Sequence, residues 1–91
     1  MAYTYKEFNF NKDIKRIISL NIRKYRKLKG YTQEELALYT DRSFEFIRRL
    51  ESEKGKRGCS IETLYRIVTV LEISMDKLFE ENVKEEKVTN R

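Results

Sequence analysis

Residues 22–52 read IRKYRKLKGYTQEELALYTDRSFEFIRRLES, and two helix starts stand out in them. Thr32 can cap a helix while Glu35, three residues later, reaches back to the cap amide, which is the capping-box arrangement. Asp41 then begins a break, and Ser43 can cap another helix. The stretch therefore predicts two short helices separated by a tight break.

Helical spacing continues on both sides of this stretch, and strand-like alternation is nearly absent. On the N-terminal side, apolar residues recur at the four-then-three spacing that lines one face of a helix, and Gly30 supplies a left-handed stop. On the C-terminal side, Ser60 and Ser74 can cap two further helices. We therefore expect an all-α, compact five-helix fold. The first helix is expected over about 13–29, the second from its cap Thr32 to near Tyr39, and the third over about 43–52. The fourth is expected to start at Ser60, and a short fifth helix at Ser74.

The apolar residues of these helices form the expected core, with Phe46 expected to be half-buried. The residues expected to face inward are Ile14, Ile18, Ile22 and Tyr25, then Leu36, Ala37 and Thr40, then Ile47 and Leu50, and finally Ile61, Leu64, Ile67, Val68 and Leu71. We expect one domain over 13–81, preceded by an extension over 1–12 and followed by a polar tail over 82–91.

Length and composition exclude several classes of protein. Ninety-one residues allow one domain with a modest core, and no run of about 18 apolar residues is present to form a transmembrane helix. The single cysteine, Cys59, suits a reducing cytoplasm. With no histidine and one cysteine, neither a zinc site nor a histidine-based triad can be built. We expect a cytoplasmic protein without membrane contact, metal, cofactor or evident small-molecule ligand, and not an enzyme, since no nucleophile–base pair is present.

The net charge of +5 is unevenly distributed along the chain. Up to Cys59 there are 15 basic and 8 acidic residues, a net of +7, whereas from Ser60 onward there are 5 basic and 7 acidic residues, a net of −2. A basic front half favours a polyanionic partner. The alternative is a solvated, lysine-rich surface, and charge alone does not decide between the two.

Two short helices around a tight break, inside a set of five, have the layout of a helix-turn-helix unit. Beyond layout, residues 22–37 closely resemble the opening of the lambda-repressor-like, or Cro/XRE-type, helix-turn-helix DNA-binding domains. The match resumes at residues 60–64 and closes at residues 73–79. Within the third helix, Ser43, Ile47, Leu50 and Glu51 fall where that family's pattern puts them. Size and the tyrosine- and lysine-rich composition also look like the controller proteins of restriction–modification systems.

The sequence departs from the family pattern at several positions. Asp41 stands where glycine is usual, and it tolerates the left-handed conformation better than most residues. Arg42 stands where a small apolar residue is usual; its methylenes could cover that spot while its charge reaches outward. The loop after Glu51 is about two residues longer than the common pattern, and Cys59 stands where proline is frequent.

The resemblance implies that the third helix enters the major groove of double-stranded DNA. By position, its readers would be Phe44, Glu45 and Arg49, with Arg48 beside them. Arg49 could form a bidentate pair with guanine, Glu45 could accept from cytosine, and Phe44 could pack on a thymine methyl. The alternatives are that Phe44 folds back or joins a dimer face, and that Glu45 pairs with Arg48 or Arg49 on the helix surface.

Other candidate contacts concern the DNA backbone. The resemblance places Gln33 as a phosphate anchor, together with the amides at the start of its helix; the alternative is a solvated side chain. We also expect Arg42 and Ser43, at the start of the third helix, to bind DNA. In the basic loop, the candidates for backbone contacts or a minor-groove arm are Lys54, Lys56 and Arg57, and the alternative is a solubilising loop.

The resemblance also implies a structural ion pair and a functional class. Arg26 and Glu51 would form a partly buried pair that joins the first and third helices and holds the reading helix at its angle. The implied function is a sequence-specific transcriptional regulator, most simply a repressor, that binds a near-palindromic operator as a homodimer. The expected pairing surface contains Tyr65, Leu78, Phe79 and Val83, which could instead belong to the monomer's own core. The rival is a protein-binding adaptor or antitoxin that grips its partner through Phe44 and Phe46.

Overall fold

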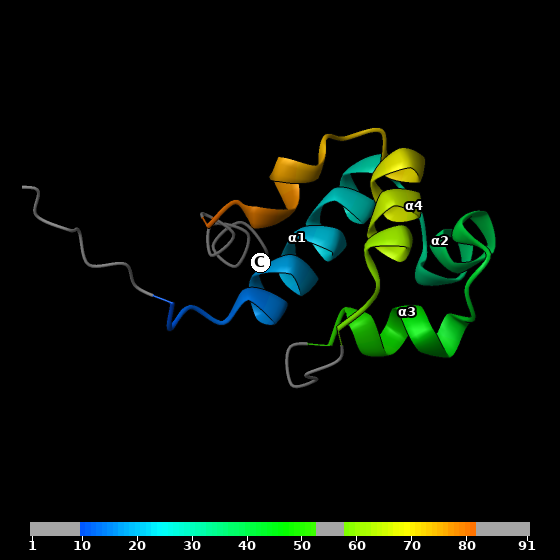
Figure 1. Ribbon diagram of the computed structural model, residues 1–91. Helices are drawn as coiled ribbons and strands as arrows, with labels where there is room; N and C mark the ends of the chain where they lie inside the picture. Colours follow the sequence, from blue (N-terminus) through cyan, green and yellow to red (C-terminus); the bar gives the residue numbers. More distant parts are fainter. Residues whose placement is uncertain (1–9, 53–57, 82–91) are drawn as a thin grey trace, which may run out of the picture.

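The computed structural model describes residues 10–52 and 58–81, and within them the chain forms helices and no strand (Figure 1). The elements are α1 (Ile14–Lys29), α2 (Gln33–Thr40), α3 (Phe44–Leu50), α4 (Ile61–Leu71) and the 3₁₀-helix η1 (Met75–Phe79). The all-α prediction is confirmed, and the fifth helix is of the 3₁₀ type. Residues 1–9, 53–57 and 82–91 lie outside the described residues, so the predictions for Lys54, Lys56, Arg57 and Val83 fall there.

The helix ends follow the predicted capping residues. The Thr32 hydroxyl accepts a hydrogen bond from the Glu35 amide at 3.0 Å, and the Glu35 carboxylate accepts one from the Thr32 amide at 2.9 Å, which confirms the capping box. Gly30 ends α1 with φ +82°, and Asp41 ends α2 with φ +60°. The left-handed turn predicted at Asp41 is therefore present, and it turns the chain sharply between α2 and α3.

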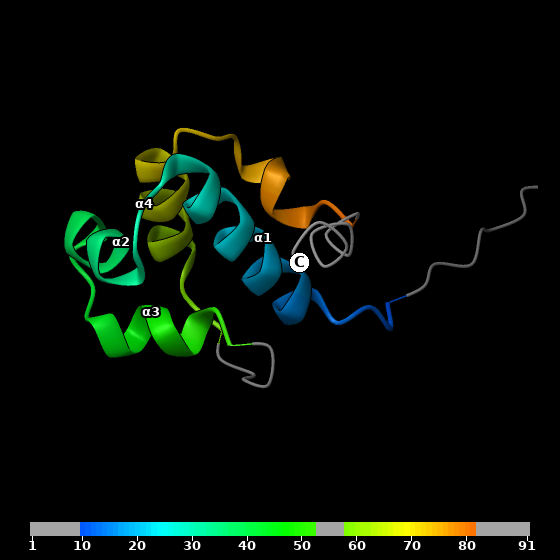
Figure 2. The ribbon, with the colours of Figure 1, turned by 180° about the vertical axis from the view of Figure 1, so that it is seen from behind.

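The helices pack so that α3 lies at one edge of the molecule and η1 at the opposite edge (Figures 1 and 2). α4 contacts α1, α2 and η1, and α2 contacts α3. The core between them contains Ile22, Leu36, Ala37, Ile47, Leu50, Ile67, Val68, Leu71 and Leu78. Among the described residues, no helix is both long enough and apolar enough to cross a membrane.

Two predictions about individual apolar side chains are wrong. Ile14 and Ile61 were expected in the core, but they are 42% and 79% exposed. Each is the first residue of its helix, and this position at the helix end leaves the side chain open to solvent. For Leu78, which was expected either on a pairing surface or in the core, the second alternative is correct: it is fully buried, because η1 packs against α1 and α4. Phe46 is half-buried, as predicted.

Buried polar contacts attach the two edges of the fold to α1. The Asn21 side-chain amide donates to the backbone oxygens of Leu78 at 2.8 Å and Glu80 at 2.9 Å, and so holds η1 in place. The Ser19 hydroxyl donates to the Leu50 carbonyl at 2.5 Å, at the last residue of α3. These contacts satisfy carbonyls at helix ends, where no partner exists within the helix.

The hydroxyl of Tyr25 makes the attachment of η1 dependent on pH. It donates to the Glu80 carboxylate at 2.7 Å, and this bond raises the pKa of Tyr25 to about 12. Because the folded-state pKa exceeds the ordinary value near 10, the folded protein retains a proton that the unfolded chain loses. The stabilisation is therefore complete below about pH 10 and declines between about pH 10 and pH 12.

We expect the urea midpoint of the wild type to fall more steeply than that of Tyr25→Phe as pH rises from 9 to 11.5. The comparison with Tyr25→Phe removes the contribution of the lysines, which titrate in the same range in both proteins. Parallel pH profiles would show that the bond between Tyr25 and Glu80 contributes nothing to folding.

Candidate nucleic-acid interface

The helix α3 buries one side and presents the other to solvent. Ile47 and Leu50 are buried against the core, while Glu45, Arg48 and Arg49 are exposed. Phe44, at the start of the helix, is 42% exposed. The Ser43 hydroxyl accepts a hydrogen bond from the Phe46 amide at 3.0 Å and so caps this helix. The outer face of α3 is therefore an exposed surface at the edge of the molecule (Figure 1).

A single carboxylate links the charged residues of that face. Glu45 accepts two hydrogen bonds from Arg48, at 3.3 Å from Nε and 2.5 Å from Nη2, and one from Arg49 Nε at 3.0 Å. These hydrogen bonds, from Arg48 first and then from Arg49, lower the pKa of Glu45. Glu45 thus pairs on the helix surface, which was one of its two predicted alternatives. The two terminal nitrogens of Arg49 make no hydrogen bond with the described residues.

Arg42 lies in the turn before α3 and points towards α4. Its Nε and Nη2 donate to the Thr63 hydroxyl at 3.1 and 3.0 Å, and its Nη1 donates to the Asp41 carbonyl at 3.0 Å. The side chain is partly buried. Because three of its nitrogens bind the protein, Arg42 fastens the turn to α4, a contact that the sequence did not predict.

Arg26 and Glu51 are joined by two hydrogen bonds inside the protein. Arg26 Nε donates to Glu51 Oε2 at 2.7 Å, and Arg26 Nη2 donates to Glu51 Oε1 at 3.0 Å. Gln33 adds a third hydrogen bond, from Nε2 to the same Oε1 at 3.0 Å. Both charged residues are buried, with 8% and 2% of their surfaces exposed. One carboxylate at the end of α3 is thus held by side chains of α1 and α2.

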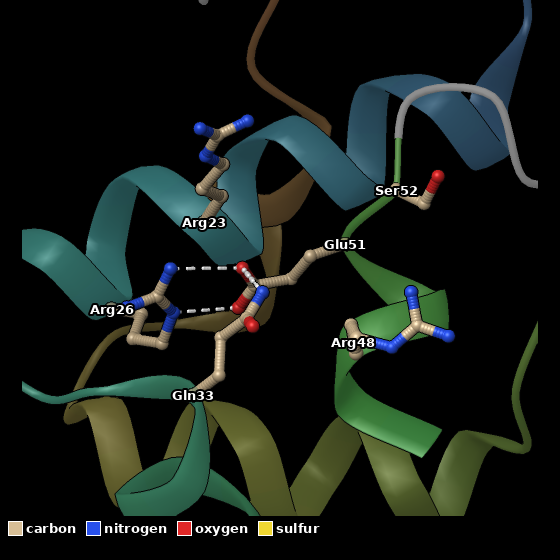
Figure 3. A pocket seen from close by; sticks show the side chains of 6 residues that line it. All are labelled: Arg23, Arg26, Gln33, Arg48, Glu51 and Ser52. Carbon is tan, nitrogen blue, oxygen red and sulfur yellow. Dashed lines mark hydrogen bonds and ion pairs between the residues drawn. The ribbon is translucent and has the colours of Figure 1, made fainter. Parts of the chain in front are cut away.

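A polar pocket of about 420 Å³ opens beside this pair, where α1, the start of α2 and the end of α3 meet (Figure 3). We call it the Arg23 pocket; its lining residues are Arg23, Arg26, Gln33, Arg48, Glu51 and Ser52. Arg23 and Arg48 lie on different sides of the hollow, with Glu51 between them. No motif in the sequence singled out Arg23. Its position three residues before Arg26, on the same side of α1, was the available signal.

Two further features of the described residues bear on chemistry. No group of three side chains that could hold a metal ion occurs within residues 10–52 and 58–81. Cys59 is half-buried, and this burial raises the pKa of its thiol. A raised pKa keeps the thiol protonated and poorly nucleophilic at neutral pH.

The family comparison covers more than half of the chain. A helix-turn-helix family model of the Cro/XRE type matches residues 22–78. These residues begin within α1 and end within η1, and they include every described candidate DNA contact. Among curated protein sequences, none matches the chain.

Solved structures of regulators share the fold. The restriction-modification controller protein C.AhdI from Aeromonas hydrophila is 26% identical, with a TM-score of 0.64, over 71% of this chain and 96% of that chain. The clp gene regulator ClgR from Corynebacterium glutamicum is 26% identical, with a TM-score of 0.65, over 71% of this chain and 67% of that chain. A mutant of the restriction-modification controller protein C.Esp1396I is 30% identical, with a TM-score of 0.64, over 93% of this chain and 100% of that chain.

Proposed function

Because this chain belongs to the Cro/XRE-type helix-turn-helix family and is therefore a DNA-binding transcriptional regulator, we propose that it is a sequence-specific repressor that binds a near-palindromic operator as a homodimer. The observation that carries this proposal is the exposed outer face of α3, which presents two arginines at the edge of the molecule. A protein of this kind acts by occupying its site, with phosphate contacts providing affinity and base contacts providing selection.

Arg49 is the proposed base reader. Its Nε is held by Glu45 at 3.0 Å, which orients the side chain and leaves both terminal nitrogens available. Those two nitrogens form the end of the guanidinium that can pair with O6 and N7 of guanine. Glu45 then has a positioning role towards Arg49, with acceptance from cytosine as its alternative, and Phe44 is placed to meet a thymine methyl.

The start of α2 is the proposed phosphate anchor. Gln33 is the first residue of that helix, and its side-chain nitrogen is bound to Glu51. This bond favours a role for Gln33 in bracing α3, while the backbone amides of the first turn of α2 remain the groups that attract a phosphate. Ser43 caps α3, and Arg42 is bound to Thr63, so we assign both a supporting role in the interface.

The homodimer proposal rests on size and on exposed apolar side chains. A single domain of this kind buries too little surface on DNA for tight binding, and two-fold pairing doubles the contact. Tyr65 on α4 and Phe79 on η1 are 62% and 44% exposed, so they remain candidates for the pairing surface. Ile61, one turn before Tyr65 on the same helix, joins them. The likeness to two restriction-modification controller proteins suggests control of such a system.

Selection of bound duplexes from a random pool tests the function directly. We expect the wild type to enrich two inverted half-sites, and Arg49→Ala to lose its preference at one base pair in each half-site. A bidentate contact with guanine contributes roughly 1–3 kcal/mol of discrimination, which is about 5- to 150-fold at that position. Lys77→Ala, which removes one charge from η1, should enrich the same site as the wild type. An unchanged site in Arg49→Ala would remove Arg49 from base reading.

A protein-binding adaptor or antitoxin is the second candidate, and the exposure of Phe44 favours it. The two functions differ in their response to salt. Affinity for duplex DNA should fall steeply with salt concentration because counterions are released, whereas a contact anchored by phenylalanine should respond weakly. Failure of the wild type to enrich any duplex would favour the adaptor.

A further inference from the structure

We propose that the Arg23 pocket binds one phosphodiester group of the DNA backbone, with Arg23 from α1 and Arg48 from α3 as its two charged ligands. This inference rests on the proposed function, in which α3 lies in the major groove. It proposes that a phosphate of the DNA strand bordering that groove binds in this pocket. It adds Arg23 to the interface and assigns Arg48, which lies beside the proposed base readers, to the backbone contacts.

The charges around the pocket favour an anion. Among the described residues that line the pocket, Glu51 is the only acidic one, and both oxygens of its carboxylate accept hydrogen bonds from Arg26 or Gln33. The buried pair of Arg26 and Glu51 is therefore neutral as a unit. Within the described part of the lining, the net positive charge therefore comes from Arg23 and Arg48.

The guanidinium of Arg23 has no polar partner in the part of the chain that the structure describes. It is partly buried, and it makes no hydrogen bond or ion pair with the described residues. The planar donors of a guanidinium match two phosphate oxygens, so an anion that enters this space would give Arg23 a charged partner. Its neighbour on α1, Lys24, lies instead 3.9 Å from the Glu80 carboxylate. Of these two adjacent cations of α1, Lys24 therefore has a carboxylate partner, and Arg23 has none among the described residues.

Arg48 completes the pocket from the other side. Glu45 holds its Nε and Nη2, so Nη1 is the nitrogen that remains for an external ligand. Because one carboxylate is shared by Arg48 and Arg49, the three side chains retain one net positive charge. Arg48 precedes Arg49, the proposed base reader, on the exposed face of α3. A phosphate held in the pocket would therefore lie next to the base that Arg49 contacts.

The salt dependence of DNA binding tests the inference. Arg23→Gln removes the charge while retaining a polar side chain, and it breaks no hydrogen bond or ion pair with the described residues, so we expect it to fold like the wild type. One lost phosphate contact makes the slope of log K against log salt less steep by about 0.9 for each bound protomer. The enriched DNA sequence should stay the same. Lys24→Gln, the matched control, should keep the wild-type slope, and Arg23→Lys should keep most of it.

Ethylation of single phosphates locates the contact. In the wild type, ethylation of one phosphate in each half-site should block binding, and Arg23→Gln and Arg48→Gln should each become insensitive at that same phosphate. Unchanged slopes, or loss of sensitivity at two different phosphates, would overturn the pocket while leaving the DNA-binding function intact. Absence of any duplex binding by the wild type would instead overturn the proposed function on which the pocket depends.

Discussion

Replacing Glu51 with alanine is expected to lower the free energy of unfolding by about 3–5 kcal/mol, because it leaves a buried charge without its partner. Arg26 is 8% exposed and would lose two hydrogen bonds, and Gln33 would lose one. Since a domain of this size is stable by only about 5–15 kcal/mol, this change removes a large share of the total. Urea denaturation followed by circular dichroism measures the loss.

Two variants separate the effect of burial from the effect of charge. Glu45→Ala removes a carboxylate that also binds two arginines, but this carboxylate is exposed, so its urea midpoint should stay close to that of the wild type. The double variant Arg26→Met with Glu51→Leu should recover most of the stability, because no unpaired charge remains. Equal midpoints for Glu51→Ala and Glu45→Ala would show that the buried pair does not stabilise the fold.

Ile47→Ala is expected to lower the free energy of unfolding by about 2–5 kcal/mol, through lost apolar contact and the cavity that remains. Ile47 is fully buried on the inner side of α3. A helix of seven residues does not persist in water by itself, so it depends on this packing and on its Ser43 cap. Thermal and urea unfolding of the variant measure the loss.

Phe44→Ala, on the outer side of the same helix, provides the matched control. It should leave the stability of the fold nearly unchanged, because the side chain is 42% exposed, and it should weaken DNA binding if Phe44 meets a base. The two variants therefore separate folding from recognition within one helix. Comparable destabilisation by both would contradict the assignment of the two faces.

Local signals in the sequence predicted where the helices begin and which residues turn the chain. A capping box needs only Thr32 and Glu35, and a left-handed turn needs only Asp41, so each is decided within a few residues. Burial depends on where neighbouring helices end, which no local pattern contains. This is why helical spacing placed Ile14 and Ile61 in the core although both are exposed.

The sequence likewise predicted some residues of the candidate DNA-binding site and missed others. The family pattern named the residues on the exposed face of α3 and the residues that form the buried pair, because sequence position fixes both. It did not predict the bonds between Arg42 and Thr63, which join segments 21 residues apart. It also missed Arg23, since a pocket becomes visible only when the helices around it are assembled.

The shared carboxylate of Glu51 has a consequence for how a duplex is chosen. Because it ties α3 to both α1 and α2, α3 cannot tilt on its own to improve its fit. If the protein docks as proposed, the adjustment falls on the DNA, and the energy of bending or narrowing a groove varies with base sequence. Base pairs that no side chain touches would then influence affinity through their stiffness.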